Sequence, residues 1–208
     1  MPYLILVRHG LSEYNKKGLW TGRDDPDLAR EGVTEAQTAA VTLRGLPIDE
    51  GFTSVQKRHK QTLDIILKTL SKESVPIIEN AALNERDYGV YTRKNKWEVK
   101  KEIGDEEFQK LRRGWDYPIP EGESLKLVYE RVVRYYQSVI LPKLKQGKNV
   151  VISSSGNALR SLVKYLEHIS DEDISKLEIA TGEVYVYKLD DKGNVLNKEI
   201  RNQHPNTA

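Results

Sequence analysis

Short apolar runs alternate with amphipathic helical segments along most of this 208-residue chain, and this alternation constrains the fold more than any other feature. Strands are predicted at residues 4–7, 51–53, 75–79 and 149–153. Between them, apolar residues recur at helical spacing, first at Val33, Ala36, Ala40 and Leu43 and then at Leu63, Ile66, Leu67 and Leu70. The alternation predicts a three-layer α/β/α architecture with a mainly parallel central sheet.

The second half of the chain predicts one long helix, one shorter helix and a closing hairpin. The long helix begins at Ser124 and has Pro142 near its end, with Leu125, Val128, Val132 and Val139 facing inward. The shorter helix is predicted over 157–168, and the hairpin strands over 184–189 and 195–200.

Residues 80–122 are less regular than the rest of the chain. Two short helices are expected there, at 97–103 and 106–113, followed by a loop with two prolines. We expect one domain over residues 1–208, in which this insertion, at about 80–122, caps the carboxyl edge of the sheet.

Composition excludes several classes of function. The 33 basic and 31 acidic residues give a formal net charge of +2, without the basic excess that is typical of nucleic-acid binders. The absence of cysteine excludes disulfides and thiolate chemistry, and no Asp-rich cluster or histidine pair at ligand spacing calls for a metal. No apolar run is long enough to span a bilayer. The first strand directly follows Met1 and Pro2, so we expect no signal peptide before it. We therefore expect a cytoplasmic location, with no nucleic-acid and no membrane partner.

The first strand ends in the sequence Arg8-His9-Gly10. Ligands of α/β proteins bind just beyond the carboxyl ends of strands. The Arg8 guanidinium suits phosphate oxygens, His9 is a nitrogen nucleophile near neutral pH, and Gly10 permits a sharp turn and close approach to a ligand. A lone histidine is more often structural than catalytic, so the interpretation depends on partners elsewhere in the chain.

Four further segments fall near predicted strand ends. They contain Arg58 in the first turns of a helix, Glu85 beyond the third strand, the pair Arg112 and Arg113, and the turn 153–157. Phosphoryl transfer needs such a set: a nucleophile, cations for the equatorial oxygens, and an acid/base group for the substrate hydroxyl. Each element taken singly also fits a solvated loop or helix face. Their joint occurrence at strand ends favours a site.

These residues carry a resemblance to a known family. Leu6-Val7-Arg8-His9-Gly10 resembles the signature of the histidine phosphatase superfamily, and other segments are similar to cofactor-dependent phosphoglycerate mutases. Those segments are Trp20-Thr21-Gly22, Phe52-Thr53-Ser54 with Arg58, Leu83-Asn84-Glu85-Arg86 with Tyr88-Gly89, Pro120 to Leu125, Gly156-Asn157 with Leu159-Arg160 and 162–166, and Glu178 to Gly182. The resemblance covers essentially the whole chain and implies the phosphoglycerate mutase fold.

The resemblance also implies roles for individual residues. It makes His9 the phosphorylated nucleophile and Glu85 the proton donor and acceptor, with Arg8, Arg58 and Asn15 on the transferring phosphoryl group. Residues implied to bind phosphoglycerate are Ser12, Thr21, Gly22, Tyr88, Lys96, Arg112, Arg113, Gly156 and Asn157, the last at the phosphoryl group. The implied reaction interconverts 3- and 2-phosphoglycerate after 2,3-bisphosphoglycerate has primed the histidine, without a metal. The family includes dimers and monomers, so both remain open.

The chain departs from the family pattern at three places. Ser155 stands where the family has a second histidine that contacts the phosphoryl group, Leu11 replaces a usual glutamate, and residues 90–93 differ from the usual leucine/glutamine/glycine run. Losing one preorganised donor commonly lowers the rate by about 10²–10³, so Ser155 predicts impaired turnover. The alternatives are a phosphatase of small phosphorylated metabolites and an inactive homologue that binds them.

Overall fold

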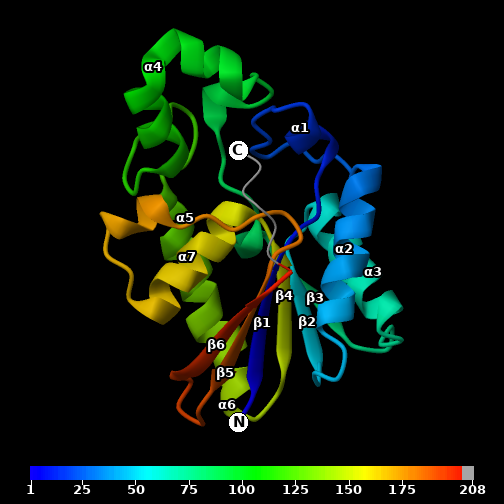
Figure 1. Ribbon diagram of the computed structural model, residues 1–208. Coiled ribbons are helices and arrows are strands. Elements are labelled where there is room, and N and C mark those ends of the chain that lie inside the picture. Colours follow the sequence, from blue (N-terminus) through cyan, green and yellow to red (C-terminus); the bar gives the residue numbers. More distant parts are fainter. Residues whose placement is uncertain (203–208) are drawn as a thin grey trace.

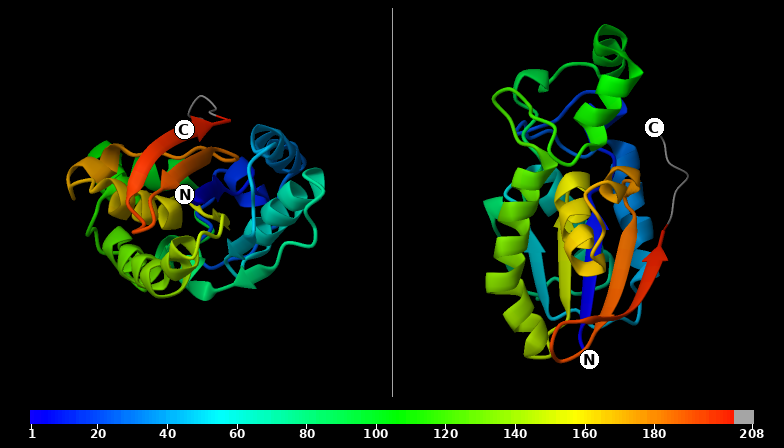
Figure 2. Two further views of the ribbon diagram at one scale, coloured as in Figure 1. Left: turned by 90° about the horizontal axis from the view of Figure 1, so that it is seen from below. Right: turned by 90° about the vertical axis from the view of Figure 1, so that its left-hand side faces the viewer.

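The computed structural model describes residues 1–202, which form a six-stranded sheet with helices on both faces (Figures 1 and 2). The strands are β1 (Tyr3–Arg8), β2 (Glu50–Thr53), β3 (Ile77–Glu79), β4 (Val150–Ser154), β5 (Val184–Leu189) and β6 (Val195–Arg201). Their order is β3-β2-β4-β1-β5-β6; the first four are parallel, and β5 and β6 are antiparallel to their neighbours. The mainly parallel sheet and the closing hairpin are thus confirmed.

The helices divide between the two faces of this sheet. They are α1 (Glu13–Lys16), α2 (Arg30–Thr42), α3 (Lys57–Thr69), α4 (Lys96–Arg113), α5 (Leu125–Tyr135), α6 (Leu141–Lys145) and α7 (Gly156–Glu167), with short turns η1 (Ala81–Leu83), η2 (Gly89–Tyr91), η3 (Tyr136–Ile140) and η4 (Asp173–Lys176). Helices α2 and α3 cover one face, and α5 and α7 cover the other (Figure 1). None of the helices within residues 1–202 has the length and apolar character needed to cross a membrane.

Strand β1 lies at the centre of the sheet and is buried on both faces. Leu4 and Leu6 pack into the cluster formed with α5 and α7, whereas Ile5 and Val7 pack into the cluster formed with α2 and α3. Successive side chains of a strand point to opposite faces. A continuous apolar run is therefore required here, and it fixes the position of the residues that follow it.

Gly10 is required by a close contact with another helix. Its backbone lies so close to Gly32, in the first turn of α2, that a Cβ on Gly10 would meet the Gly32 carbonyl oxygen at 2.1 Å. Gly10 has no positive φ. The missing side chain thus allows α2 to pack against the loop that follows His9.

Residues 80–122 lie above the carboxyl edge of the sheet (Figures 1 and 2). The two predicted helices are both present and form α4, which is broken by Gly104 at φ 82°. The segment and the 19–22 region share a small apolar cluster of their own, made of Trp20, Tyr88, Val99, Phe108, Leu111 and Ile119. This cluster positions α4 and its cations over the strand ends.

The long helix predicted from Ser124 is present with one irregularity. It follows Ser124, widens into the π-helical turn η3 and continues through α6 to Lys145, so Pro142 lies near its end, as predicted. Proline has no N–H to donate to the preceding turn, and the wider turn is bridged instead by the Leu141 N–H to the Tyr136 carbonyl. Val33 is 36% exposed, because Gly32 and Ala36 make the close contacts of α2.

Candidate active site

His9 lies immediately beyond β1 and is 2% exposed. Its Nδ1 lies 2.7 Å from the carbonyl oxygen of Gly10. A carbonyl only accepts hydrogen bonds, so Nδ1 carries the proton and Nε2 keeps its lone pair. Burial and the neighbouring guanidiniums of Arg58 and Arg8 hold the pKa of His9 well below its ordinary value. The imidazole is therefore neutral at physiological pH, which is the form that a nucleophile needs.

Two arginines beside His9 have donors without a protein acceptor. Arg8 donates through Nη1 to the Ile179 carbonyl, and Arg58 donates through Nη1 to the Asp24 carbonyl at 3.2 Å. Nε of Arg8 and both Nε and Nη2 of Arg58 are buried and find no partner within residues 1–202. Burial lowers the pKa of Arg58 to about 10, so it remains charged near neutral pH. Buried, charged and unpaired donors are costly unless they serve an anion.

Gly156, the first residue of α7, keeps the approach to Arg8 open. A Cβ at this position would lie 3.4 Å from Nε of Arg8 and 3.5 Å from its guanidinium carbon. The unpaired Nε thus faces the first turn of a 12-residue helix, where backbone N–H groups favour anions. The strand-to-helix turn that the sequence identified therefore faces one of the two arginines.

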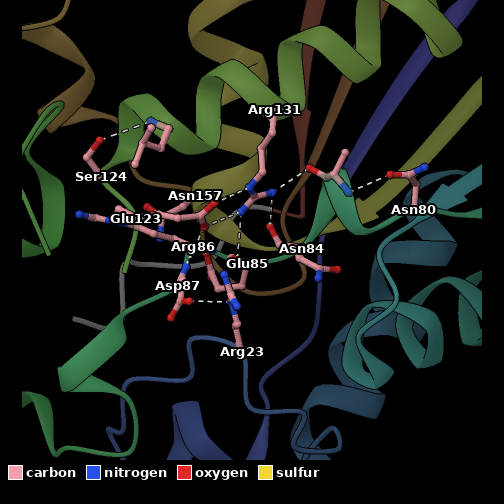
Figure 3. A network of polar contacts seen from close by, with 12 residues as sticks. Arg23, Asn80, Asn84, Glu85, Arg86, Asp87, Glu123, Ser124, Arg131 and Asn157 are labelled. Atoms are coloured by element: carbon pink, nitrogen blue, oxygen red, sulfur yellow. Dashed lines mark hydrogen bonds and ion pairs between the residues drawn. The ribbon is translucent and has the colours of Figure 1, made fainter. Parts of the chain in front are cut away.

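The loop that carries Glu85 is fixed by hydrogen bonds from Arg131 of α5 (Figure 3). The Arg131 guanidinium donates to the carbonyl oxygens of Ala82, Asn84 and Glu85 at 2.8–3.1 Å and pairs with Glu123. The backbone N–H of Glu85 donates to Oε1 of Gln56 at 2.8 Å. A loop fixed at so many backbone groups holds its carboxylate in one place, as acid/base chemistry requires.

Asn157 connects Glu85 to the far wall of the site. Its Nδ2 donates to Oε1 of Glu85 at 3.1 Å and to the Tyr88 hydroxyl at 2.8 Å. Its Oδ1 accepts from Nη1 of Arg160 at 3.0 Å. Burial lowers the pKa of Arg160 to about 9, which leaves this 1% exposed residue charged at neutral pH.

A strongly cationic pocket opens between the strand ends and α4. The empty space within it, including its open mouth, is about 560 Å³. Predicted residues that line it are Arg8, Asn15, Thr21, Glu85, Tyr88, Lys96, Arg112, Arg113, Gly156 and Asn157, and they are joined by Trp20, Arg160 and Ile179. Five cations thus surround one carboxylate, so the pocket suits a ligand with several negative charges.

The cations of α4 differ in their surroundings. Lys96 lies 5.5 Å from the Trp20 ring centre, and burial together with Arg8 and Arg112 lowers its pKa to about 8. Arg113 pairs with Glu178, and burial lowers the Arg113 pKa to about 10. Near neutral pH Lys96 and Arg113 are therefore mainly protonated.

Five predicted residues do not line the pocket wall. His9 and Arg58 lie beneath it, Ser155 is buried at the start of α7, and Gly22 is buried with its carbonyl accepting from Gln56 Nε2 at 3.2 Å. Ser12 is a helix cap: its Oγ accepts from the Asn15 N–H and donates to Oδ1 of Asn15. Ser12 therefore acts on Asn15, which does line the pocket.

Four residues near this site were not assigned to it by the sequence: Trp20, Arg160, Ile179 and His59. Arg160 lies three residues after Asn157, so the same helix face could have identified it. His59 directly follows Arg58, and its ring centre is 5.0 Å from that of His9. Among residues 1–202, no three His, Cys, Asp or Glu side chains are grouped so as to hold a metal ion.

Comparison with known proteins places this site in a family. The family model of the histidine phosphatase superfamily (branch 1) matches residues 4–200. This chain belongs to that superfamily. It is 47% identical to a 2,3-bisphosphoglycerate-dependent phosphoglycerate mutase of Parvibaculum lavamentivorans, over 95% of each chain, and 44% identical to the enzyme of that name from Bradyrhizobium diazoefficiens, over 94% of this chain and 95% of the relative. The resemblance inferred from the sequence motifs is thus confirmed.

The fold is also that of solved members of the superfamily. Bacillus stearothermophilus YhfR superimposes with a TM-score of 0.84, over 99% of this chain and 98% of that chain, at 20% identity. At this identity the likeness supports the α/β/α architecture alone. The predicted fold class is confirmed.

Proposed function

We propose that this histidine phosphatase interconverts 3-phosphoglycerate and 2-phosphoglycerate through a phosphohistidine at His9. The observation that carries the proposal is the neutral His9, with Nδ1 protonated, beside the unpaired buried donors of Arg8 and Arg58. The relatives named 2,3-bisphosphoglycerate-dependent phosphoglycerate mutase, at 44–47% identity, support the proposal.

The residues present fit a bisphosphorylated acid as primer. The pocket carries five cations and one carboxylate, and Arg8, which lines it, has a buried Nε with no partner within residues 1–202, as do Nε and Nη2 of the neighbouring Arg58. When bound, 2,3-bisphosphoglycerate supplies the phosphoryl group that is transferred to His9. Arg8 and Arg58 then hold two of the phosphoryl oxygens, while Lys96, Arg112 and Arg113 hold the carboxylate and the phosphate that is not transferred.

Glu85 moves the proton in each transfer. As the hydroxyl oxygen of a bound phosphoglycerate attacks phosphorus, its proton passes to the Glu85 carboxylate and the bond from phosphorus to Nε2 of His9 breaks. In the reverse transfer, Nε2 attacks phosphorus and Glu85 returns the proton to the departing oxygen. Asn157, which donates to Oε1 of Glu85 at 3.1 Å, holds this carboxylate beside the transferring group.

The proposal is tested by incubating the protein with 2,3-bisphosphoglycerate and measuring its intact mass, beside a coupled mutase assay. We expect a phosphoryl adduct that is absent from His9→Asn, and isomerisation that is lost by at least about 10⁴ in that variant. Phosphate release without isomerisation would show that the protein acts as a phosphatase instead. Saturable calorimetric binding with no adduct would show a binding protein. Either result would contradict the mutase proposal.

A further inference from the structure

His59 is a second imidazole that lies against His9. It is the third residue of α3, directly after Arg58, and is 0% exposed. The two ring centres are 5.0 Å apart, with the planes inclined by 35°. The His59 side chain is thus a buried neighbour of the proposed nucleophile, although the sequence motifs assign it no role.

Ser54 contacts the His59 ring. Its hydroxyl oxygen accepts the Gln56 N–H at 3.0 Å and also forms a hydrogen bond with Nδ1 of His59. In the tautomer in which the hydroxyl donates to Nδ1, the ring proton is on Nε2, and this is the tautomer that the inference below requires. Nε2 is buried and, like the neighbouring donors of Arg8 and Arg58, has no acceptor in the part of the chain that the structure describes.

The charges around His59 keep it neutral but favour an anion beside it. Burial and the cationic Arg58, with smaller effects of His9 and Arg8, hold the pKa of His59 well below its ordinary value. A neutral ring with a proton on Nε2 is a hydrogen-bond donor. Beside two arginines, the group that such a donor suits is an oxygen of a phosphoryl group.

Position 155 provides an independent observation. In the sheet, β4 lies between β1, which ends before His9, and β2, which leads to α3. The end of β4 contacts both sides: the His9 N–H donates to the Ser154 carbonyl at 2.9 Å, and Ser153 Oγ donates to the His59 carbonyl at 2.9 Å. Ser155 follows with a buried hydroxyl that has no partner within residues 1–202. Because serine at 155 supplies no imidazole, His59 is the histidine whose ring lies against His9 among the described residues.

We propose that His59 is a further phosphoryl-binding residue, whose Nε2–H donates to an oxygen of the phosphoryl group carried by His9. The inference rests on the proposed function and deepens it. It assigns to α3 the imidazole that the resemblance expected after β4, so Ser155 does not leave the site without one.

The test is the single-turnover rate of His9 phosphorylation by 2,3-bisphosphoglycerate, followed by intact mass in His59→Ala and His59→Gln. We expect His59→Ala to slow phosphorylation by about 10²–10³, the effect of losing one preorganised donor. Glutamine keeps an N–H near the position of Nε2, so His59→Gln should stay within about tenfold of the unmodified protein. His168→Ala changes an exposed histidine at the end of α7 and should leave the rate unchanged.

Thermal melting of each variant separates this role from a packing role. If His59→Ala and His59→Gln are folded and phosphorylate at the unmodified rate, or if both lose rate equally, the donor role of His59 is contradicted. These outcomes are distinct from failure of the proposed function, in which the unmodified protein itself gains no phosphoryl group on His9.

Discussion

The floor and the cap of the site are built on different principles. The floor, made of Arg8, His9, Arg58, His59 and Ser155, lies at the ends of β1 and β4 and the start of α3, and several of its polar atoms are buried without a partner among residues 1–202. The cap, made of Lys96, Arg112 and Arg113, lies on α4 and is partly exposed. In the cap, Arg113 pairs with Glu178 and Lys96 lies over Trp20.

This difference separates transfer from recognition. Donors that are fixed by the sheet and shielded from water stabilise charge that develops in a transition state. Cations on a separate segment with its own small core can recognise a charged ligand without taking part in the transfer. We therefore expect changes in the floor to lower kcat and changes in the cap to raise KM.

The largest expected difference is between Arg58→Met and Arg112→Met. Arg58 is 0% exposed with two unpaired nitrogens, so its loss should lower kcat by about 10²–10³. Arg112 lines the pocket and is only partly buried, so its loss should raise KM by about tenfold, with kcat nearly unchanged. Steady-state kinetics in the coupled assay measure both constants.

Thermal melting sharpens this comparison. Methionine at position 58 removes a buried charge with one hydrogen bond, from Nη1 to the Asp24 carbonyl, and two nitrogens that have no partner within residues 1–202, so Arg58→Met should melt at the same temperature as the unmodified protein or higher. A lower melting temperature together with a KM effect would mean that Arg58 acts in packing and substrate binding, and the division between floor and cap would then fail.

The sequence predicted where Arg8, His9, Arg58 and Ser155 lie in the fold, because the ends of strands can be recognised in it. The apolar run 4–7 must be buried on both faces, and this places His9 at the carboxyl edge where Arg58 and the 153–157 turn also lie. The helical spacing of the insertion likewise predicted both halves of α4. Periodicity identifies the buried face of an element and its ends. This information was sufficient to place the predicted residues at one edge of the sheet.

Contacts between segments that are distant in the sequence could not be predicted from periodicity. The role of Gly10 depends on Gly32, a residue in another element, and the contact of His59 with His9 depends on the packing of α3 against β4. A histidine that follows Arg58 in a helix could equally have faced solvent. Only the packed structure shows that this ring is buried with an unsatisfied nitrogen.

A smaller effect is expected from pH in the cap. Burial lowers the pKa of Lys96 to about 8, so the affinity for phosphoglycerate should fall as pH rises through about 8 and the cation is lost. Folding stability should change in the opposite direction. The unfolded lysine, with its pKa of 10.5, binds more protons than the folded one between these values, so stability rises with pH across that window.

Lys96→Met should remove both trends, and the measurements are KM against pH and thermal melting against pH. In this variant KM at pH 7 should be several-fold higher and should show no inflection near pH 8. If the inflection persists in Lys96→Met, the titrating group belongs elsewhere in the site, and the cap does not depend on this lysine for its charge.

The smallest expected effect is that of Ser155→His. A site that lacks a second imidazole would gain at least about tenfold in turnover from this substitution, as the motif pattern alone predicts. A floor in which His59 already supplies an Nε2–H donor gains less than about threefold, since the donor position beside His9 is filled. The coupled assay distinguishes the two, with Ser161→His, at a buried serine of the same helix that is not among the residues lining the pocket, as a control for the added volume. A tenfold gain specific to position 155 would show that the β4 end of the floor, and not α3, is where this chain needs its imidazole.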